Sequence, residues 1–394
     1  MGDPKFDNDP SAKVRPEEGL LRMRKKLGLY ANIRPTYTFD SLMDKSPIKR
    51  SIIEGTDLVF VRELTGGIYF GKRGRKDNNN FAFDTCEYSK EEIIRLAKIG
   101  FELSLKRSKK LCCIDKANVL ESSRLWRETV QSMEKEYPDV QVSYEFVDAV
   151  AMRLIQNPSS YDVLITGNLF GDILTDEASV ISGSMGLMPS ASVGLKTSIY
   201  EPIHGSYPQA KGKNIANPLA TILSASMMFE GSFGLIEESE LIKQVVSDSI
   251  TKKIVTGDLS GNDKFYSTEE VGSWICKELK KDKYYLSSSL SIFFFKSANA
   301  SISPRVDLST VSFLVVDLVF FLGSFISFLK VAECDITILL KSLLNSITLN
   351  SASSPLFKEL PSSLMVCFFG TKALNSSFKK IEPPLSEIDS NENL

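Results

Sequence analysis

The chain has 394 residues, which is long enough for two domains with substantial hydrophobic cores. Its formal net charge of -2 gives no reason to expect nucleic acid as a partner. Six cysteines without C-x-x-C or zinc-type spacing favour a reduced, cytoplasmic setting, and the polar, proline-interrupted start of the chain does not resemble a signal peptide.

The first predicted element is an amphipathic helix in the segment RPEEGLLRMRKKLGLYANIRP. Its positions i, i+3, i+4 and i+7 hold Glu17, Leu20, Leu21 and Arg24. An ordinary core-facing stripe would explain the two leucines. An arginine that extends this stripe, with Arg34 further along the chain, would also form a carboxylate clamp beside an apolar patch.

Two further elements are predicted before residue 110. A strand at Leu58–Val61 precedes Arg62 and the glycine-flanked loop ELTGGIYFG, which contains Tyr69. The capping box Ser89-x-x-Glu92 then opens a helix over Ser89–Lys106. We expect one buried face on this helix, made of Ile94, Ala97, Phe101 and Leu105.

Three strands with polar residues at their carboxyl ends follow. Leu111–Ile114 precedes Asp115 and Lys116, and the alternating residues Val142, Tyr144 and Phe146 lead to Asp148. Tyr161–Thr166 leads into GNLFGDILTDEAS, which places Asp172 and Asp176 on one face of a helix. This order of strands and helices predicts an α/β sandwich with ligands at the strand C-termini.

Each of these polar residues also has a purely structural interpretation. Arg62 would form a surface ion pair, Tyr69 would anchor a loop, Lys116 would be solvated and Asp148 would be an N-cap. The two aspartates would face solvent at a helix start, where acidic side chains suit the helix dipole. Their shared position at strand ends favours a site, and like charges four residues apart imply a positive partner between them.

The composition changes near residue 284. From Leu286 to Asn375 the chain is a mixture of Ser, Leu and Phe with few charges and no persistent period. Val311–Leu329 is long and apolar enough to span a bilayer, although Asp317 interrupts it. We expect this tail to be disordered or not native to the protein rather than a membrane anchor.

Seven ordered motifs carry a resemblance to a known family: GDPKFDN, RPEEGLLRMRKKLGLYANIRP, VRELTGGIYFG, DKANVLESSRLWRE, VDAVAMRLIQNP, GNLFGDILTDEAS and YEPIHGSYPQAKGKNIANP. Residues 2 to about 280 resemble the isocitrate/isopropylmalate dehydrogenases, and among them the isopropylmalate branch. These enzymes are β-decarboxylating dehydrogenases without the G-x-G-x-x-G loop. The resemblance implies oxidative decarboxylation of 3-isopropylmalate to 4-methyl-2-oxopentanoate in leucine biosynthesis.

The family's fold implies a two-domain α/β sandwich. We expect residues 1–30 and 183–283 to form a large, cofactor-side domain and residues 31–182 a small domain for dimerisation, metal and substrate. Family members carry a first strand, a glycine-rich turn and a helix ahead of GDPKFDN, so we expect these to be missing here and the core to be destabilised. The tail at 284–394 is expected to be unrelated to the family.

The resemblance also implies the roles of the polar residues. Asp172, Asp176 and Asp148 would bind Mg²⁺ or Mn²⁺, because hard cations prefer oxygen ligands. Lys116 would accept the proton of the substrate's C2 hydroxyl, and Tyr69 would protonate C3. In the family, Lys116 and Asp148 enter the site from a second subunit, which implies a homodimer. The substrate's two carboxylates would be bound by Arg24, Arg34 and Arg62.

The loop HGSYPQAKGKNIANP is expected to bind NAD. The family implies that His204 lies by the adenine, that Glu17 also contacts the cofactor, and that the pocket is shaped by Gly205, Ser206 and Asn217. Many NAD-specific members carry Asp at the position of Gln209. A glutamine there can bond to a ribose hydroxyl but cannot repel a 2′-phosphate, so NAD remains the expected cofactor with weaker discrimination.

Substrate choice in the family depends on the group at C3. The apolar wall of Leu20 and Leu21 suits an isopropyl group, whereas a third carboxylate would lose hydration there without a partner. We therefore rank isopropylmalate above isocitrate, homoisocitrate and tartrate. An inactive, truncated remnant is the other alternative.

Overall fold

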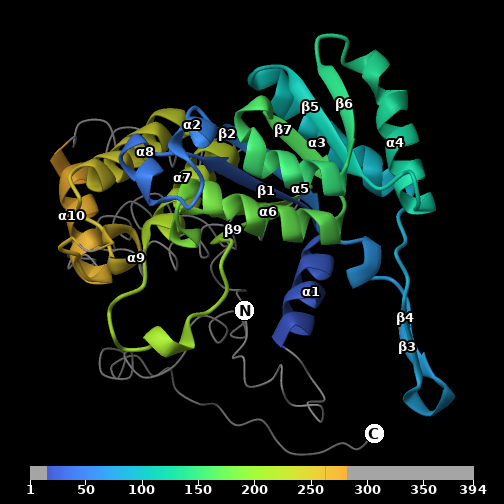
Figure 1. The fold of residues 1–394 in the computed structure, drawn as a ribbon, viewed down its shortest axis with the longest axis horizontal. Coiled ribbons are helices and arrows are strands. Elements are labelled where there is room, and N and C mark those ends of the chain that lie inside the picture. Colours follow the sequence, from blue (N-terminus) through green and yellow to red (C-terminus); the bar gives the residue numbers. More distant parts are fainter. Residues whose placement is uncertain (1–15, 262, 282–394) are drawn as a thin grey trace, which may run out of the picture. The chain divides into compact units, whose positions relative to one another are not determined.

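The computed structural model describes residues 16–261 and 263–281 of the chain (Figure 1). The motif GDPKFDN and the segment from residue 284 onward, including Val311–Leu329, lie outside the described residues. Within the two described ranges, no helix has both the length and the apolar character needed to cross a bilayer.

The described part of the chain is built on a seven-stranded sheet with the order β6-β5-β7-β2-β1-β8-β9. The strands are β1 (Leu29–Tyr37), β2 (Asp57–Glu63), β5 (Lys110–Asp115), β6 (Gln141–Phe146), β7 (Val163–Thr166), β8 (Pro189–Gly194) and β9 (Ser198–Pro202). Four neighbours, β6, β5, β7 and β2, run parallel, and β1 is antiparallel to both β2 and β8. A separate hairpin pairs β3 (Arg73–Lys76) with β4 (Phe81–Asp84) and projects away from the sheet in Figure 1.

Helices cover both faces of the sheet, and further helices pack on these. The helices of the described residues are α1 (Pro16–Leu27), α2 (Arg50–Ile53), α3 (Lys90–Lys106), α4 (Glu121–Met133), α5 (Val147–Gln156), α6 (Asn168–Ser182), α7 (Leu219–Phe233), α8 (Ile236–Thr251), α9 (Gly257–Ser260) and α10 (Thr268–Lys281). Short 3-10 turns lie at η2 (Asp40–Lys45), η3 (Gly67–Tyr69), η4 (Asp77–Asn79), η5 (Glu134–Glu136), η6 (Pro158–Ser160), η7 (Met185–Leu187) and η8 (Pro208–Ala210).

Alternation along the central strands divides the core between the two faces. On β7, Val163 and Ile165 pack with Phe101 of α3 and Trp126 of α4, whereas Leu164 packs on the other side with residues of α5 and α6. Such strands are buried on both faces, so they read as continuous apolar runs. This confirms the α/β fold class and the four predicted strands, which are β2, β5, β6 and β7.

The capping box of α3 is confirmed, but its predicted buried face is partly wrong. Ser89 Oγ accepts a hydrogen bond from Glu92 N, and the Glu92 side chain accepts one from Ser89 N. Ala97 and Phe101 are buried as expected, whereas Ile94 and Leu105 are exposed. The helix is rotated about its axis relative to the prediction, because Gly100 lies against β7. A Cβ at Gly100 would stand 2.4 Å from Ile165 Cγ2. The buried face therefore includes Ile93, Leu96, Gly100 and Ser104.

The N-terminal motif contains a helix and then a strand. Helix α1 ends at Leu27 because Gly28 adopts a φ of +67°, a left-handed conformation that suits glycine. Arg34 consequently lies on β1, a strand that the sequence analysis did not predict, as it did not predict β8 and β9. These strands join the segments 1–30, 31–182 and 183–283 in one continuous sheet, and the division of the chain into two domains stays a prediction.

The strand register aligns the polar strand ends at one edge of the sheet. Arg62 on β2 pairs with Thr166 on β7, Thr166 pairs with Ile114 on β5, and Asp115 pairs with Phe146 on β6. Since β2, β7, β5 and β6 are parallel, the residues that follow their carboxyl ends emerge at this edge. The sequence therefore predicted correctly that these groups share an edge.

Candidate active site

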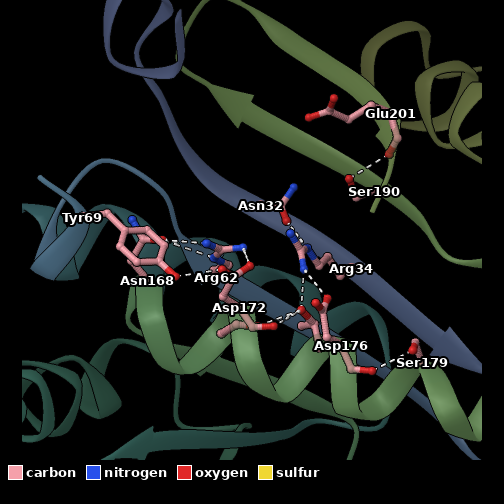
Figure 2. Close-up of polar contacts among 12 residues, drawn as sticks. Asn32, Arg34, Arg62, Tyr69, Asn168, Asp172, Asp176, Ser179, Ser190 and Glu201 are labelled. Atoms are coloured by element: carbon pink, nitrogen blue, oxygen red, sulfur yellow. Dashed lines mark hydrogen bonds and ion pairs between the residues drawn. The ribbon is translucent and has the colours of Figure 1, made fainter. Parts of the chain in front are cut away.

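Arg62 lies at the centre of the candidate site. Only 2% of this residue is exposed, and its guanidinium forms an ion pair with Asp172 Oδ1 of α6 (Figure 2). Its Nη2 also donates to Asn168 Oδ1 at 2.9 Å. The hydroxyl of Tyr69, from η3, donates to the second oxygen of Asp172 at 2.8 Å. Arg62 is thus a buried ion-pair partner, not a surface one.

Arg34, which is itself buried, makes the next contact with α6, one turn further along. Its Nη1 lies 3.7 Å from Asp176 Oδ1 and donates to Thr175 Oγ1, while its Nε donates to Asn32 Oδ1 (Figure 2). In the register of the sheet, Asn32 of β1 is paired with Arg62 of β2. Arg34 lies two residues beyond Asn32 and so shares its face of the sheet, which places Arg34 on the same face as Arg62. The two arginines are therefore the positive partners that the aspartate pair implied.

Arg24 of α1 completes a group of three buried arginines. Its Nη2 lies 3.9 Å from Glu201 Oε1 of β9, and its Nε is buried without a hydrogen-bond partner among the described residues. Burial lowers the pKa of Arg24, and the charge of Arg62 lowers it further. Burial and Arg62 likewise lower the pKa of Arg34, to about 10. The arginines repel one another, so this group of buried cations favours an additional anion.

Asp172 and Asp176 offer carboxylate oxygens that suit Mg²⁺ or Mn²⁺. They lie one turn apart on α6, beyond its first turn, and both side chains are partly exposed. Burial raises the pKa of Asp176 against the lowering effect of Arg34, and the charge of Asp172 adds to the rise. In residues 16–261 and 263–281 no three acidic, histidine or cysteine side chains gather as a metal site. The carboxylates of Asp172 and Asp176 therefore fit a divalent cation, but they provide only part of its ligands.

Lys116 and Asp148 form a pair of their own. Lys116 Nζ donates to Asp148 Oδ1 at 2.7 Å, and this contact is the main cause that lowers the pKa of Asp148. Within the described ranges no hydrogen bond or ion pair joins them to the arginine–aspartate group. Asp148 lies in the first turn of α5, whose N-cap is Phe146, so Asp148 is not itself the N-cap. The chain therefore does not bring all the expected catalytic residues together.

The expected cofactor residues lie on an exposed loop after β9. Gly205, Ser206 and Gln209 are exposed, and His204 Nδ1 lies 3.1 Å from Gly205 O. Asn217 is held at the end of the loop, because it donates to Asp258 Oδ2 at 2.9 Å and accepts from Leu219 N. Imidazole, hydroxyl and carboxamide groups on an open loop fit the polar groups of a nucleotide.

The remaining expected site residues lie on α1. Glu17, Leu20 and Leu21 are all partly exposed. They share this helix with the buried Arg24, so an apolar surface adjoins one of the three guanidinium groups.

Four polar residues that the sequence analysis missed hold the arginines in place. They are Asn32, Asn168, Thr175 and Glu201. All four lie inside the motifs that carry the resemblance, and their place in those motifs was the available signal. Periodicity could not have identified them, because Asn32, Asn168 and Thr175 are buried polar residues in elements where apolar residues are the usual core.

Comparison with known proteins assigns the family. The model of the isocitrate/isopropylmalate dehydrogenase family matches residues 1–275. The chain belongs to the isocitrate/isopropylmalate dehydrogenase family. It is therefore an enzyme of a dehydrogenase family, and the fold class implied by the resemblance is confirmed.

Individual members of the isocitrate/isopropylmalate dehydrogenase family are closely similar. The chain is 56% identical to a 3-isopropylmalate dehydrogenase of Bacteroides fragilis, over 71% of this chain and 79% of that protein. It is 51% identical to one of Rhodopirellula baltica over the same shares. Among solved structures, an isocitrate dehydrogenase from Methylococcus capsulatus matches with a TM-score of 0.63 and 31% identity, over 69% of this chain and 78% of that chain.

Proposed function

We propose that this chain oxidises and decarboxylates 3-isopropylmalate to 4-methyl-2-oxopentanoate, with NAD⁺ as hydride acceptor, as a step of leucine biosynthesis. Support comes from relatives named 3-isopropylmalate dehydrogenase, at 46–56% identity. The structural observation that carries the proposal is the group formed by Arg24, Arg34 and Arg62. Buried cations need paired anions, and a substrate with two carboxylates adds the charge that this group of arginines favours.

The surface beside the arginines supports the choice of substrate. Leu20 and Leu21 share α1 with Arg24 and would contact the C3 substituent. An isopropyl group would gain from this contact, whereas the third carboxylate of isocitrate would lose hydration without a partner. We therefore propose isopropylmalate ahead of isocitrate, homoisocitrate and tartrate.

The residues of the chain divide the chemistry among them. The arginine group would orient the two carboxylates by charge-assisted hydrogen bonds. Lys116 would accept the C2 hydroxyl proton, and Tyr69 would donate a proton to C3 after carbon dioxide leaves. Burial and the hydrogen bond to Asp172 raise the pKa of Tyr69 to about 12, so its hydroxyl keeps this proton at neutral pH.

Two groups would supply chemistry that side chains lack. Asp172, Asp176 and Asp148 would hold Mg²⁺ or Mn²⁺, which when bound provides a Lewis acid next to the substrate's oxygen atoms. The loop from His204 to Asn217 would hold NAD⁺, which accepts the hydride. Glu17 would contact the same cofactor from α1.

We propose that the active form is a homodimer with shared sites. The pair Lys116–Asp148 would enter the site of the other copy, where Asp148 would complete the cation's ligands. The packed helices α5 and α6 support this arrangement, because Met152 and Ile155 of α5 and Ile173 of α6 are each more than half exposed. Exposed apolar side chains on packed helices favour association with a second copy.

The thiol of Cys86 is exposed, which suits a reducing, cytoplasmic setting.

The test is the appearance of NADH absorbance with purified full-length protein, Mg²⁺ and each candidate substrate. We expect 3-isopropylmalate with NAD⁺ to give the highest kcat/KM. Faster turnover of isocitrate, homoisocitrate or tartrate would reassign the substrate. No turnover of any of the four would contradict the proposal and favour an inactive remnant.

A further inference from the structure

Asn168 connects Arg62 with the turn that carries Tyr69. Its Oδ1 accepts hydrogen bonds from Arg62 Nη2 at 2.9 Å and Nε at 3.3 Å, and its Nδ2 donates to the carbonyl oxygen of Gly66 at 3.2 Å. Gly66 is the N-cap of η3, the turn that carries Tyr69. Because Tyr69 and Arg62 both contact Asp172, these groups close a ring of contacts (Figure 2).

We propose that Asn168 is a positioning residue, which sets Arg62 and Tyr69 at the separation that the reaction requires. The inference rests on the proposed function, since it assigns Arg62 to substrate carboxylate binding and Tyr69 to proton donation. The Asn168 amide contacts both Arg62 and η3, the turn that carries Tyr69. A shift of either one relative to the other would therefore break a hydrogen bond to Asn168.

The amide also selects the edge of Arg62 that faces the site. Asn168 occupies the edge formed by Nε and Nη2, which leaves Nη1 directed at Asp172. A guanidinium is a planar fork, so holding one edge orients the other. Because the amide is neutral, it accepts these hydrogen bonds without cancelling the charge that attracts a substrate carboxylate. A carboxylate at residue 168 would cancel much of that charge.

The surroundings of Asn168 are closely packed. Only 1% of this residue is exposed, and its backbone N–H donates to Tyr88 Oη at 2.8 Å. Tyr88 in turn packs closely against η3: a Cβ at Gly67 would lie 2.2 Å from the hydroxyl oxygen of Tyr88. A fixed anchor of this kind is what precise placement of reacting groups needs.

The test compares Asn168→Asp, Asn168→Ala and a control, Asn157→Ala, in the full chain. Asn157 is an exposed residue at the end of α5, outside the ring of contacts. We expect Asn168→Asp to raise the KM for 3-isopropylmalate about 10- to 100-fold, and more than Asn168→Ala does. We expect Asn168→Ala to lower kcat about 10- to 100-fold, because both partners lose their common anchor. The control should match the wild type.

A purely structural role predicts the opposite order for KM. Asp keeps the oxygen that accepts from Arg62 and loses only the bond donated to Gly66, whereas Ala loses all three bonds, so a purely structural role makes Asn168→Asp the milder variant in thermal unfolding temperature and in KM. A KM that rises less in Asn168→Asp than in Asn168→Ala would overturn the inference, as would values for both variants within about twofold of the wild type. If the wild-type chain itself turns over no candidate substrate, the proposed function fails, which is a different result. Binding of 3-isopropylmalate to each folded variant by calorimetry then tests the order independently of turnover.

Discussion

The hydroxyl of Tyr69 and the carboxylate of Asp172 are joined by a hydrogen bond of 2.8 Å, and the other oxygen of Asp172 is paired with Arg62. The proposed acid therefore contacts a proposed cation ligand and lies next to a proposed substrate-binding arginine, whose guanidinium carbon is 5.9 Å from the centroid of the tyrosine ring. Proton donation, cation binding and substrate binding would thus meet at the carboxylate of Asp172. A change in Tyr69, Asp172 or Arg62 is therefore expected to affect the other two.

Replacing Tyr69 with Phe removes the proton donor and keeps the ring. We expect kcat for 3-isopropylmalate to fall about 10²- to 10⁴-fold, with KM little changed, because general acid catalysis typically contributes that much. Steady-state kinetics measure both constants, and Tyr266→Phe, on the loop before α10, is the matched control. Unchanged kcat in Tyr69→Phe would assign the proton to another group.

The same substitution should change how stability depends on alkaline pH. The folded chain holds the pKa of Tyr69 near 12, above its ordinary value of 10.0, so the folded state favours the neutral phenol. This contribution is complete below pH 10 and is lost as the pH rises from 10 through 12. We expect the wild type to lose more stability than Tyr69→Phe between these pH values, measured by urea unfolding at a series of pH values. Parallel curves for the two proteins would contradict the raised pKa.

Mixing two inactive variants tests the shared site. In a dimer of Lys116→Ala with Asp172→Ala, one site receives Lys116 from the second copy and Asp172 from the first, so it is intact. Random reassociation should restore about a quarter of wild-type activity, because half of the dimers are mixed and half of their sites are complete. Sites built within one chain would stay inactive in every combination, and that result would remove the dimer proposal.

Asp176 provides a test of cation binding that does not depend on turnover. We expect Asp176→Asn to weaken Mn²⁺ binding by about 100-fold, since losing even an outer-shell partner costs about 10- to 100-fold. Electron paramagnetic resonance of free Mn²⁺ measures this, and chelation by EDTA should stop NADH formation by the wild type. Asp139→Asn, an exposed partner of Lys109, is the control. Equal Mn²⁺ affinity in all three proteins would place the cation elsewhere.

Gln209 should determine how strictly the enzyme distinguishes NAD⁺ from NADP⁺. We expect the wild type to prefer NAD⁺, and Gln209→Asp to lower kcat/KM for NADP⁺ by about tenfold, since a carboxylate near the 2′-phosphate adds like-charge repulsion. The kcat/KM ratio of the two cofactors is the measurement, with Gln131→Asp on α4 as the control. A wild-type preference for NADP⁺ would overturn the expected cofactor.

Local patterns predicted some elements well and failed at others for a physical reason. The capping box of α3 and the strands β2, β5, β6 and β7 follow from residues close together in the sequence. The strand β1 was missed because Asn32, Arg34 and Thr36 are polar residues that the fold buries. Polar residues usually lie outside, so a buried functional strand lacks the ordinary signal.

The sequence by itself determined the family, the α/β class and the residue types that a dehydrogenase site requires, because ordered motifs and local hydrogen-bonding rules are carried by short segments. Only the tertiary structure decided which of those residues meet. Arg34 contacts Asp176, and Arg62 contacts both Asn168 and Asp172, since β1 pairs antiparallel with β2 and α6 packs across both strands. Such contacts depend on strand register and helix rotation, which are set by packing over the whole core and not by the spacing of residues along the chain.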